Sequence, residues 1–206
     1  MSLLVGITGG MGSGKTLAAS IFHELGAHIL DADVICRKLV EPGQPALKEI
    51  SECFGKSIID EFGNLDRKKI AQVIFYDPKK KNDLENILHP RVFEFENLEY
   101  KNISQKHPKA LVIVDAALLI ESGNYKKMDK VIVVKANKKT QIERVLAQRG
   151  WNYNEVVARI KNQMPIAEKI KYAYFVLDNS LDEASLRKKV KDLYIKLSFM
   201  AAEKNT

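Results

Sequence analysis

One short segment near the amino terminus constrains the fold more than any other feature of the chain. Residues 9–16 read Gly-Gly-Met-Gly-Ser-Gly-Lys-Thr and match the pattern G-x-x-x-x-G-K-[ST]. An apolar run from Leu3 to Thr8 precedes the motif. Apolar side chains on one helical stripe, closed by Gly26, follow it: Ala18, Ile21, Phe22 and Leu25. The sequence therefore predicts a buried strand, a glycine-rich turn and a helix, in that order.

Each residue type in this motif has a physical role. Glycines let the backbone turn so tightly that successive N–H groups point at phosphate oxygens, and the following helix adds its positive end. Lys15 would reach the β- and γ-phosphates, and the hydroxyl of Thr16 would bind Mg²⁺. The motif predicts a nucleoside-triphosphate site but does not name the reaction.

Strand-like and helical segments alternate along the rest of the chain. Further strands are expected at His28 to Leu30, Ala110 to Val114, Val131 to Val134 and Tyr174 to Leu177. A closing helix is expected from the stripe Leu186, Val190, Leu193 and Leu197. This alternation favours an α/β fold with a mainly parallel sheet.

The stretch between the second and third strands is longer than a crossover needs and indicates an inserted helical subdomain. Two helical stripes are expected there, one of Ile70, Val73 and Ile74 and the other of Leu84, Ile87 and Leu88. His89-Pro90 lies in the same stretch, where a histidine before a proline is often only the end of a helix.

Composition excludes several classes of protein. The 206 residues carry a net charge of +7, which suggests an anionic partner: nucleic acid, a phosphorylated metabolite or a membrane surface. The longest apolar stretch, Ala110 to Ile120, contains Asp115 and is too short to cross a bilayer. Cys36 and Cys53 form no metal-binding pattern, and no signal peptide is evident, so a cytoplasmic protein without nucleic-acid or membrane partners is expected. Apart from Lys15, the lysines are expected to be solvated surface.

Three aspartates follow predicted strands and could carry chemistry. Asp31 and Asp33 are two residues apart, and either carboxylate could take the proton of an attacking hydroxyl. Alternatively, Asp33 could be the N-cap of a helix that begins near Val34. Asp115 ends a buried strand, where a carboxylate that supports Mg²⁺ is expected, although an exposed loop aspartate is the alternative.

Arginines in the region after the fourth strand are the candidates for nucleotide contacts. Arg144, Arg149 and Arg159 could stack on adenine or neutralise the transferred phosphoryl group, or they could form a solvated basic face. The segment 137–140 resembles the guanine-specific signature of GTPases but ends in Thr140, which lacks the carboxylate that reads the base. A GTPase switch is therefore not favoured.

Five segments together resemble the dephospho-coenzyme A kinase family. In chain order they are LVGITGGMGSGKT, GAHILDADVICRKLVEPGQPAL, LENILHPRVF, VIVDAALLIE and AYFVLDNS. The resemblance extends from Leu3 to about Leu197. It implies a three-layer P-loop kinase fold with a five-stranded parallel sheet, in one domain over residues 1–206. The core would comprise about 1–33, 109–138 and 173–206, with a helical substrate-binding insertion at about 34–108 and a lid at about 139–172.

The resemblance also implies an activity and a set of site residues. Family members use ATP and Mg²⁺ to phosphorylate the ribose 3′-hydroxyl of dephospho-coenzyme A, the last step of coenzyme A synthesis. Asp33 would be the general base, and Lys15 and Arg149 would stabilise the phosphoryl group. Asp33, His89 and Arg91 would contact the acceptor, and Thr16 and Asp115 would hold the metal. ATP would be bound by Gly10, Met11, Gly12, Ser13, Gly14, Lys15, Thr16, Leu17, Arg149 and Asn179.

The chain departs from the family pattern at four places. Leu17 stands where a second hydroxyl often follows Thr16, and Phe93 replaces a frequent arginine. Ala117 replaces the proline that usually follows the third strand, and Gly150 replaces the aspartate often paired with Arg149. Two alternatives remain open: another P-loop kinase for a small molecule or nucleotide, and a non-catalytic nucleotide-binding protein. A monomer is favoured.

Overall fold

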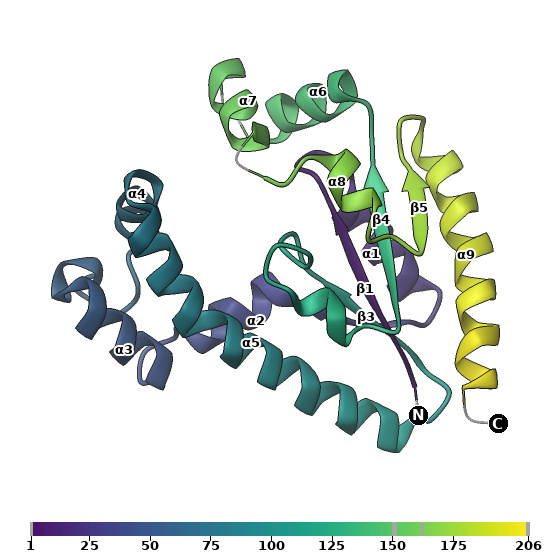
Figure 1. Cartoon of the computed structure of the whole chain (residues 1–206), viewed down its shortest axis with the longest axis horizontal. Helices are drawn as coiled ribbons and strands as arrows, with labels where there is room; N and C mark the ends of the chain where they lie inside the picture. The colour runs from purple at the N-terminus through teal and green to yellow at the C-terminus, as the bar shows by residue number, and fades with distance from the viewer. Residues whose placement is uncertain (1, 150–151, 162, 205–206) are drawn as a thin grey trace. The chain divides into compact units, whose positions relative to one another are not determined.

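The computed structural model describes residues 2–149, 152–161 and 163–204 (Figure 1). Its strands are β1 (Leu3–Gly9), β2 (His28–Asp31), β3 (Leu111–Asp115), β4 (Lys130–Lys135) and β5 (Phe175–Asp178). Its helices are α1 (Lys15–Glu24), α2 (Ala32–Leu39), α3 (Pro45–Phe54), α4 (Arg67–Tyr76), α5 (Pro78–Lys106), α6 (Lys138–Arg149), α7 (Tyr153–Lys161), α8 (Ile166–Ile170) and α9 (Glu183–Glu203), with short 3₁₀ turns at Lys56–Ile58 and Asn124–Lys127.

The chain divides into two compact units. One consists of Met1–Leu30 and Glu99–Thr206 and contains the sheet; the other is Asp31–Leu98 and is helical. The helical unit corresponds closely to the predicted insertion. That the whole chain acts as a single domain with a lid stays a prediction.

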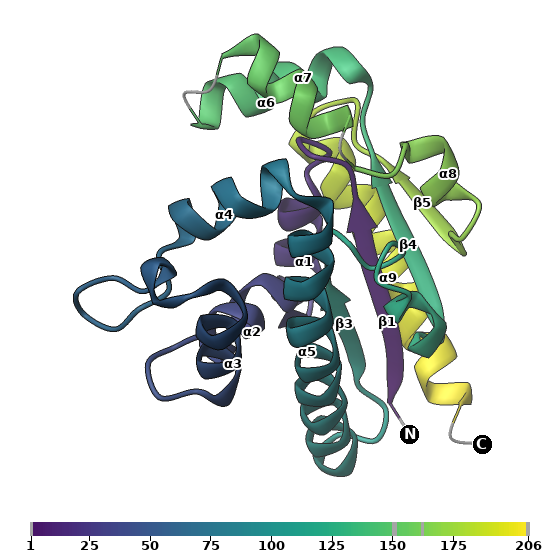
Figure 2. The ribbon, with the colours of Figure 1, turned by 60° about the vertical axis from the view of Figure 1, so that its left-hand side comes forward.

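The five strands form one parallel sheet, as predicted, and their order in it is β2-β3-β1-β4-β5. β1 pairs with β3 from Leu3↔Leu111 to Ile7↔Asp115, and with β4 from Val5↔Lys130 to Gly9↔Val134. Because the strands are parallel and in these registers, the ends of β1 and β3 lie side by side at one edge of the sheet. The views of Figures 1 and 2 both place α6 and α7 beyond this edge.

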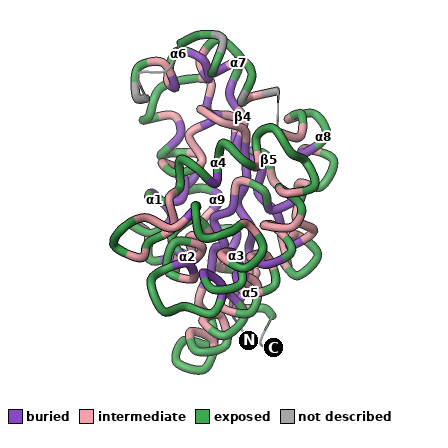
Figure 3. The backbone as a smooth tube through the Cα atoms, turned by 90° about the vertical axis from the view of Figure 1, so that its left-hand side faces the viewer, coloured by how far each residue is buried: buried purple, intermediate pink, exposed green. Residues whose placement is uncertain are grey.

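The core of the sheet unit is formed by the central strands and by α1 and α9. Most residues of β1, β3 and β4 are buried, and Figure 3 colours buried residues purple along the backbone. Strands buried on both faces read as continuous apolar runs, which is why the sequence predicted them well. The predicted stripe of α9 is confirmed, since its four leucine and valine positions, Leu186, Val190, Leu193 and Leu197, are all buried in this core.

The helical unit has a smaller core of its own. Val40, Ala46, Ile50, Ile58, Ile70 and Ile87 form it, with Ile74, Leu84 and Leu88 packed against it. Two predictions were wrong here. Val73 is 38% exposed, since α4 turns only Ile70 and Ile74 inward. Pro90 does not end a helix but lies inside α5, because apolar contacts of Ile87 before it and Val92 after it keep both halves packed.

Both cysteines are free, with Cys36 half-buried and Cys53 exposed. Burial raises the pKa of the Cys36 thiol, so it is protonated at neutral pH. Among the described helices, none has the length and apolar character needed to span a bilayer.

Candidate active site

The glycine-rich loop leads from β1 into α1 and needs glycine at two positions. Gly12 and Gly14 have φ values of 71° and 84°, in the left-handed region. A Cβ on Gly14 would lie 2.1 Å from Nδ2 of Asn179, and one on Gly12 would lie 2.5 Å from the carbonyl oxygen of Gln141. No side chain of the described structure caps the first turn of α1, so its amides are open to an anion.

Lys15 and Asp115 form an ion pair at the edge where β1 and β3 end. Asp115 is only 4% exposed, so the alternative of a water-exposed loop aspartate was wrong. Each charge compensates the other in this buried place, where an unpaired charge would be costly. The pair therefore brings together Lys15, which is predicted to contact the phosphates, and Asp115, which is predicted to support the metal.

The oxygens of Asp115 and Thr16 are suited to Mg²⁺. This ion prefers carboxylate, hydroxyl and phosphate oxygens and is usually bound by one or two protein groups together with substrate phosphates. Asp115 is at the end of β3, and Thr16 follows Lys15 in the first turn of α1, with an exposed side chain. The residues present therefore fit the ion that the motif predicts.

Asn179 is brought against the loop from the opposite end of the sequence. It is 2% exposed, and its Nδ2 donates to the carbonyl oxygen of Ser13 at 2.9 Å. Arg144 donates to the carbonyl oxygens of Asn179 and Leu181, at 3.1 and 3.3 Å. Arg144 is thus anchored beside the loop and is not simply part of a solvated basic face.

The carboxylate of Asp178 fixes the turn that carries Asn179. It accepts from the backbone amide of Ser180 at 2.9 Å and pairs with Lys135 at 3.0 Å. Hydrogen bonding to Ser180, with a smaller contribution from Lys135, lowers the pKa of Asp178 to about 2. The carboxylate is therefore ionised at neutral pH, which keeps this turn closed.

Asp33 is free for chemistry because Asp31 caps the helix. Oδ1 of Asp31 accepts from the amides of Asp33 and Val34 at 2.8 and 3.0 Å, and α2 begins at Ala32. The alternative in which Asp33 is the cap was therefore wrong. Asp33 is exposed in the first turn, and within the described chain its carboxylate has no hydrogen bond or ion pair.

The two residues expected to contact the acceptor besides Asp33 point to different sides of α5. His89 and Arg91 are two positions apart in a continuous helix, which separates them by about 200°. His89 stacks on Phe93 with ring centroids 5.8 Å apart, and burial lowers the pKa of its imidazole. Arg91 bonds Glu49 at 2.5 Å and the carbonyl oxygen of Ile87 at 2.6 Å. Contact of both side chains with the acceptor stays a prediction.

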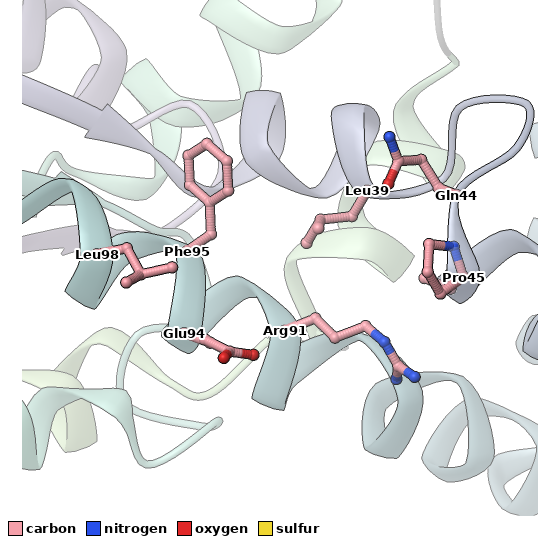
Figure 4. A pocket seen from close by; sticks show the side chains of 8 residues that line it. Leu39, Gln44, Pro45, Arg91, Glu94, Phe95 and Leu98 are labelled. Carbon is pink, nitrogen blue, oxygen red and sulfur yellow. The ribbon is translucent and has the colours of Figure 1, made fainter.

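Arg91 lines a hollow of the helical unit. This hollow measures about 240 Å³ and is open on one side. Figure 4 shows the side chains around it, which come from α2, α3, α5 and the turn before α3: Leu39, Gln44, Pro45, Ala46, Arg91, Glu94, Phe95 and Leu98. Its walls are mainly apolar, and the guanidinium of Arg91 stays bonded to Glu49 at its rim.

The remaining lid candidates are only partly described. Arg149 ends α6, but its side chain, the side chain of Arg159 and the whole of Gly150 lie outside the described residues. Met11 is described: its amide donates to Oε1 of Gln163 at 2.9 Å, and its side chain packs against the cluster of Ile142, Val145 and Val156. Met11 thus joins the loop to the α6–α7 region.

Lys169 is the residue that sequence reasoning missed. The sequence predicts a solvated lysine here, and this prediction is wrong: Lys169 is completely buried and bonded to the carbonyl oxygen of Ala117 and to Glu121. The sequence around Lys169 gives no sign that this lysine is buried. Its partner Glu121 lies 48 positions earlier in the chain, and only the fold brings the two side chains together.

Comparison with known proteins agrees with this geometry. Residues 3–184 match the family model described as dephospho-CoA kinase. The chain is 42% identical over 194 residues to a dephospho-CoA kinase of Aquifex aeolicus, covering 94% of this chain and 97% of that one.

Two solved structures resemble the whole chain. A Thermus thermophilus protein superposes with a TM-score of 0.80 at 31% identity, covering 95% of this chain and 98% of that one. A dephospho-CoA kinase of Campylobacter jejuni gives a TM-score of 0.71 at 26% identity, with both chains fully covered. The match of the family model and the identity to the Aquifex protein show that the chain belongs to the dephospho-CoA kinase family of ATP-dependent phosphotransferases.

Proposed function

We propose that the protein transfers the γ-phosphate of ATP to the ribose 3′-hydroxyl of dephospho-coenzyme A, as the last step of coenzyme A synthesis in the cytoplasm. The observation that carries the proposal is the ion pair between Lys15 and the buried Asp115, beside an uncapped, glycine-rich helix start. This arrangement offers a cation and a row of amides to phosphates, and a carboxylate to a metal.

Binding of ATP would break the ion pair between Lys15 and Asp115 and replace it by contacts with the ligand. The ammonium group of Lys15 leaves Asp115 for the β- and γ-phosphate oxygens, so that its charge remains compensated. Asp115, directly or through water, and Thr16 would then hold Mg²⁺, which neutralises negative charge on the phosphates. Residues 10–17 would surround the phosphates, and Asn179 would fix the loop from the side of the adenine.

Asp33 is proposed as the general base. The 3′-oxygen of the acceptor forms a bond to the γ-phosphorus while the bond from this phosphorus to the β–γ bridging oxygen breaks, which releases ADP. The proton of the 3′-hydroxyl passes to the carboxylate of Asp33. That carboxylate is available because Asp31 supplies the helix cap.

The other site residues follow from family membership. Arg149 would stabilise charge on the phosphoryl group from the lid. Of the two proposed acceptor contacts on α5, we favour His89 for direct contact, since Arg91 is engaged by Glu49 and the Ile87 carbonyl. We expect a monomer to be sufficient for this reaction.

Acceptor-dependent ADP release tests the proposal. We expect release with dephospho-coenzyme A, and little with other nucleosides, other nucleotides or nucleic acid. Equal release with a different nucleoside or nucleotide would favour another P-loop kinase. Release that no small acceptor stimulates would point to a nucleotide-binding protein or an ATPase.

A further inference from the structure

We propose that Lys169 is a positioning residue for phosphoryl transfer: it holds the loop after Asp115 so that the carboxylate stays in place for the metal. The proposal rests on the function proposed above. It concerns residues 163–169, which we call the bracket and which lie entirely in the sheet unit. In Figures 1 and 2 the part of the bracket in α8 lies beside β4.

Lys169 makes two specific bonds in a fully buried place. Its side chain is 0% exposed, and Nζ donates to the carbonyl oxygen of Ala117 at 2.8 Å. Nζ also pairs with Oε1 of Glu121 at 2.9 Å. Ala117 and Glu121 both belong to the loop that follows β3. A buried ammonium group is tolerated only when such partners compensate it.

The carbonyl of Ala117 links the end of β1 to the loop that follows β3, and both carry residues of the candidate site. Besides Lys169, the buried hydroxyl of Thr8 donates to it at 3.0 Å. Thr8 immediately precedes the glycine-rich loop, and Ala117 comes two residues after Asp115. A displacement of this carbonyl would therefore move both the phosphate loop and the carboxylate of Asp115.

The bracket reaches the same two loops at its other end. Oε1 of Gln163 accepts from the amide of Met11 in the glycine-rich loop at 2.9 Å. The amide of Met164 donates to Oε1 of Glu121 at 3.3 Å, the same oxygen that pairs with Lys169. One short segment thus contacts the phosphate loop through Gln163 and the loop after Asp115 through Met164 and Lys169.

Packing alone would not require a lysine here. A methionine fills a similar volume, and replacing a buried ion pair by apolar groups is often neutral or stabilising. An apolar side chain, however, cannot donate to the Ala117 carbonyl. Mutation of a group that orients a metal ligand without touching the metal typically lowers metal affinity or activity by about 10- to 100-fold.

The test removes both charges of the pair together. In Lys169→Met/Glu121→Gln no charge is left unpaired, and the amide oxygen of glutamine can still accept from Met164. The matched control is Lys171→Met/Glu168→Gln, which makes the same substitutions in an exposed pair of α8 and its C-terminal end with a separation of 2.8 Å. Each protein is measured for thermal unfolding, for ATP affinity with and without Mg²⁺, and for kcat and KM.

We expect the buried double variant to fold and to lose metal-dependent function. The gain in ATP affinity caused by Mg²⁺ should fall by about 10-fold, and kcat by about 10- to 100-fold. KM for dephospho-coenzyme A should change less than about 3-fold, since none of the residues proposed to contact the acceptor belongs to the bracket. The control should match the wild type in every measurement.

A wild-type Mg²⁺ effect and kcat in the folded double variant would overturn the proposal and leave Lys169 a structural residue. If that variant does not fold, Thr8→Val decides, because it removes the other donor to the same carbonyl in a residue of equal shape. A reduced Mg²⁺ effect in this variant supports the proposal, and an unchanged one overturns it. ATP binding is measured without acceptor, so a wild type inactive on dephospho-coenzyme A would contradict only the proposed function.

Discussion

Glycines of the two units differ in what surrounds them. In the phosphate loop, Gly12 and Gly14 combine a positive φ with neighbours so close that a Cβ would overlap them. In the helical unit, Gly43, Gly55 and Gly63 also have a positive φ, but nothing lies within 4 Å of their Cβ positions. The phosphate loop is held by contacts with distant parts of the chain, whereas the turns of the helical unit only need a permissive backbone. Substitution of a glycine in the phosphate loop should therefore impair function, whereas substitution of one of these glycines in the helical unit should mainly lower local stability.

The largest effect is expected at the centre of the phosphate loop. Lys15→Ala should lower kcat by about 1,000-fold or more, because the charge on the transferred phosphoryl group loses its main protein cation. The measurement is ADP release at saturating dephospho-coenzyme A. Lys139→Ala, at an exposed lysine of α6, is the control and should keep wild-type kcat. Wild-type turnover of Lys15→Ala would contradict the assignment of the loop.

The helical unit provides the next comparison through its paired aspartates. Asp33→Asn should lower kcat by about 100- to 10,000-fold while ATP binding is kept, because the amide cannot take the proton of the 3′-hydroxyl. Asp31→Asn is the matched control, since asparagine also caps helices and kcat should stay near wild type. Equal losses in both variants would remove the distinction between base and cap.

The two kinds of glycine can be compared directly. Gly14→Ala should weaken ATP binding by at least about 10-fold and destabilise the fold, because the new methyl group would displace Asn179 from the Ser13 carbonyl. Gly55→Ala meets no neighbour and should lower the free energy of unfolding by about 1–3 kcal/mol, because its φ of 86° and ψ of 159° define a region that essentially only glycine occupies. Isothermal titration with ATP and urea unfolding measure both. An unchanged ATP affinity in Gly14→Ala would contradict the comparison.

The smallest effect is a pH dependence that arises in the turn before Asn179. The folded-state pKa of Asp178 is lowered to about 2 by Ser180 and Lys135, so its stabilisation is complete above the unfolded pKa of about 4. It is lost as the pH falls from about 4 to about 2, and the effect is small because the side chain is partly exposed. Urea unfolding between pH 2 and 5 should show a weaker pH dependence for Asp178→Asn than for the wild type. Identical slopes would show that the turn contributes nothing to acid sensitivity.

Simple apolar patterns predict the elements of the sheet unit better than those of the helical unit. The central strands and the α9 stripe were found because strands buried on both faces and helices packed on a sheet have simple apolar patterns. The errors at Pro90 and Val73 arose where local preference was outweighed by packing in the helical unit. The spacing of Asp31 and Asp33 does not show which of them caps the helix. The start of α2 at Ala32 makes Asp31 the N-cap and leaves the carboxylate of Asp33 free.

Local patterns, and motifs in a fixed order, are enough to predict the phosphate loop, the succession of strands and helices along the chain, and the family. Which side chains meet depends on how the whole chain folds. Lys15 and Asp115 are 100 positions apart, and Ser13 and Asn179 are 166 apart. The burial of Lys169 was decided in the same way, because its partners come from a loop after another strand. No local pattern encodes such contacts, since parallel strands bring their ends together only after the intervening chain has crossed over.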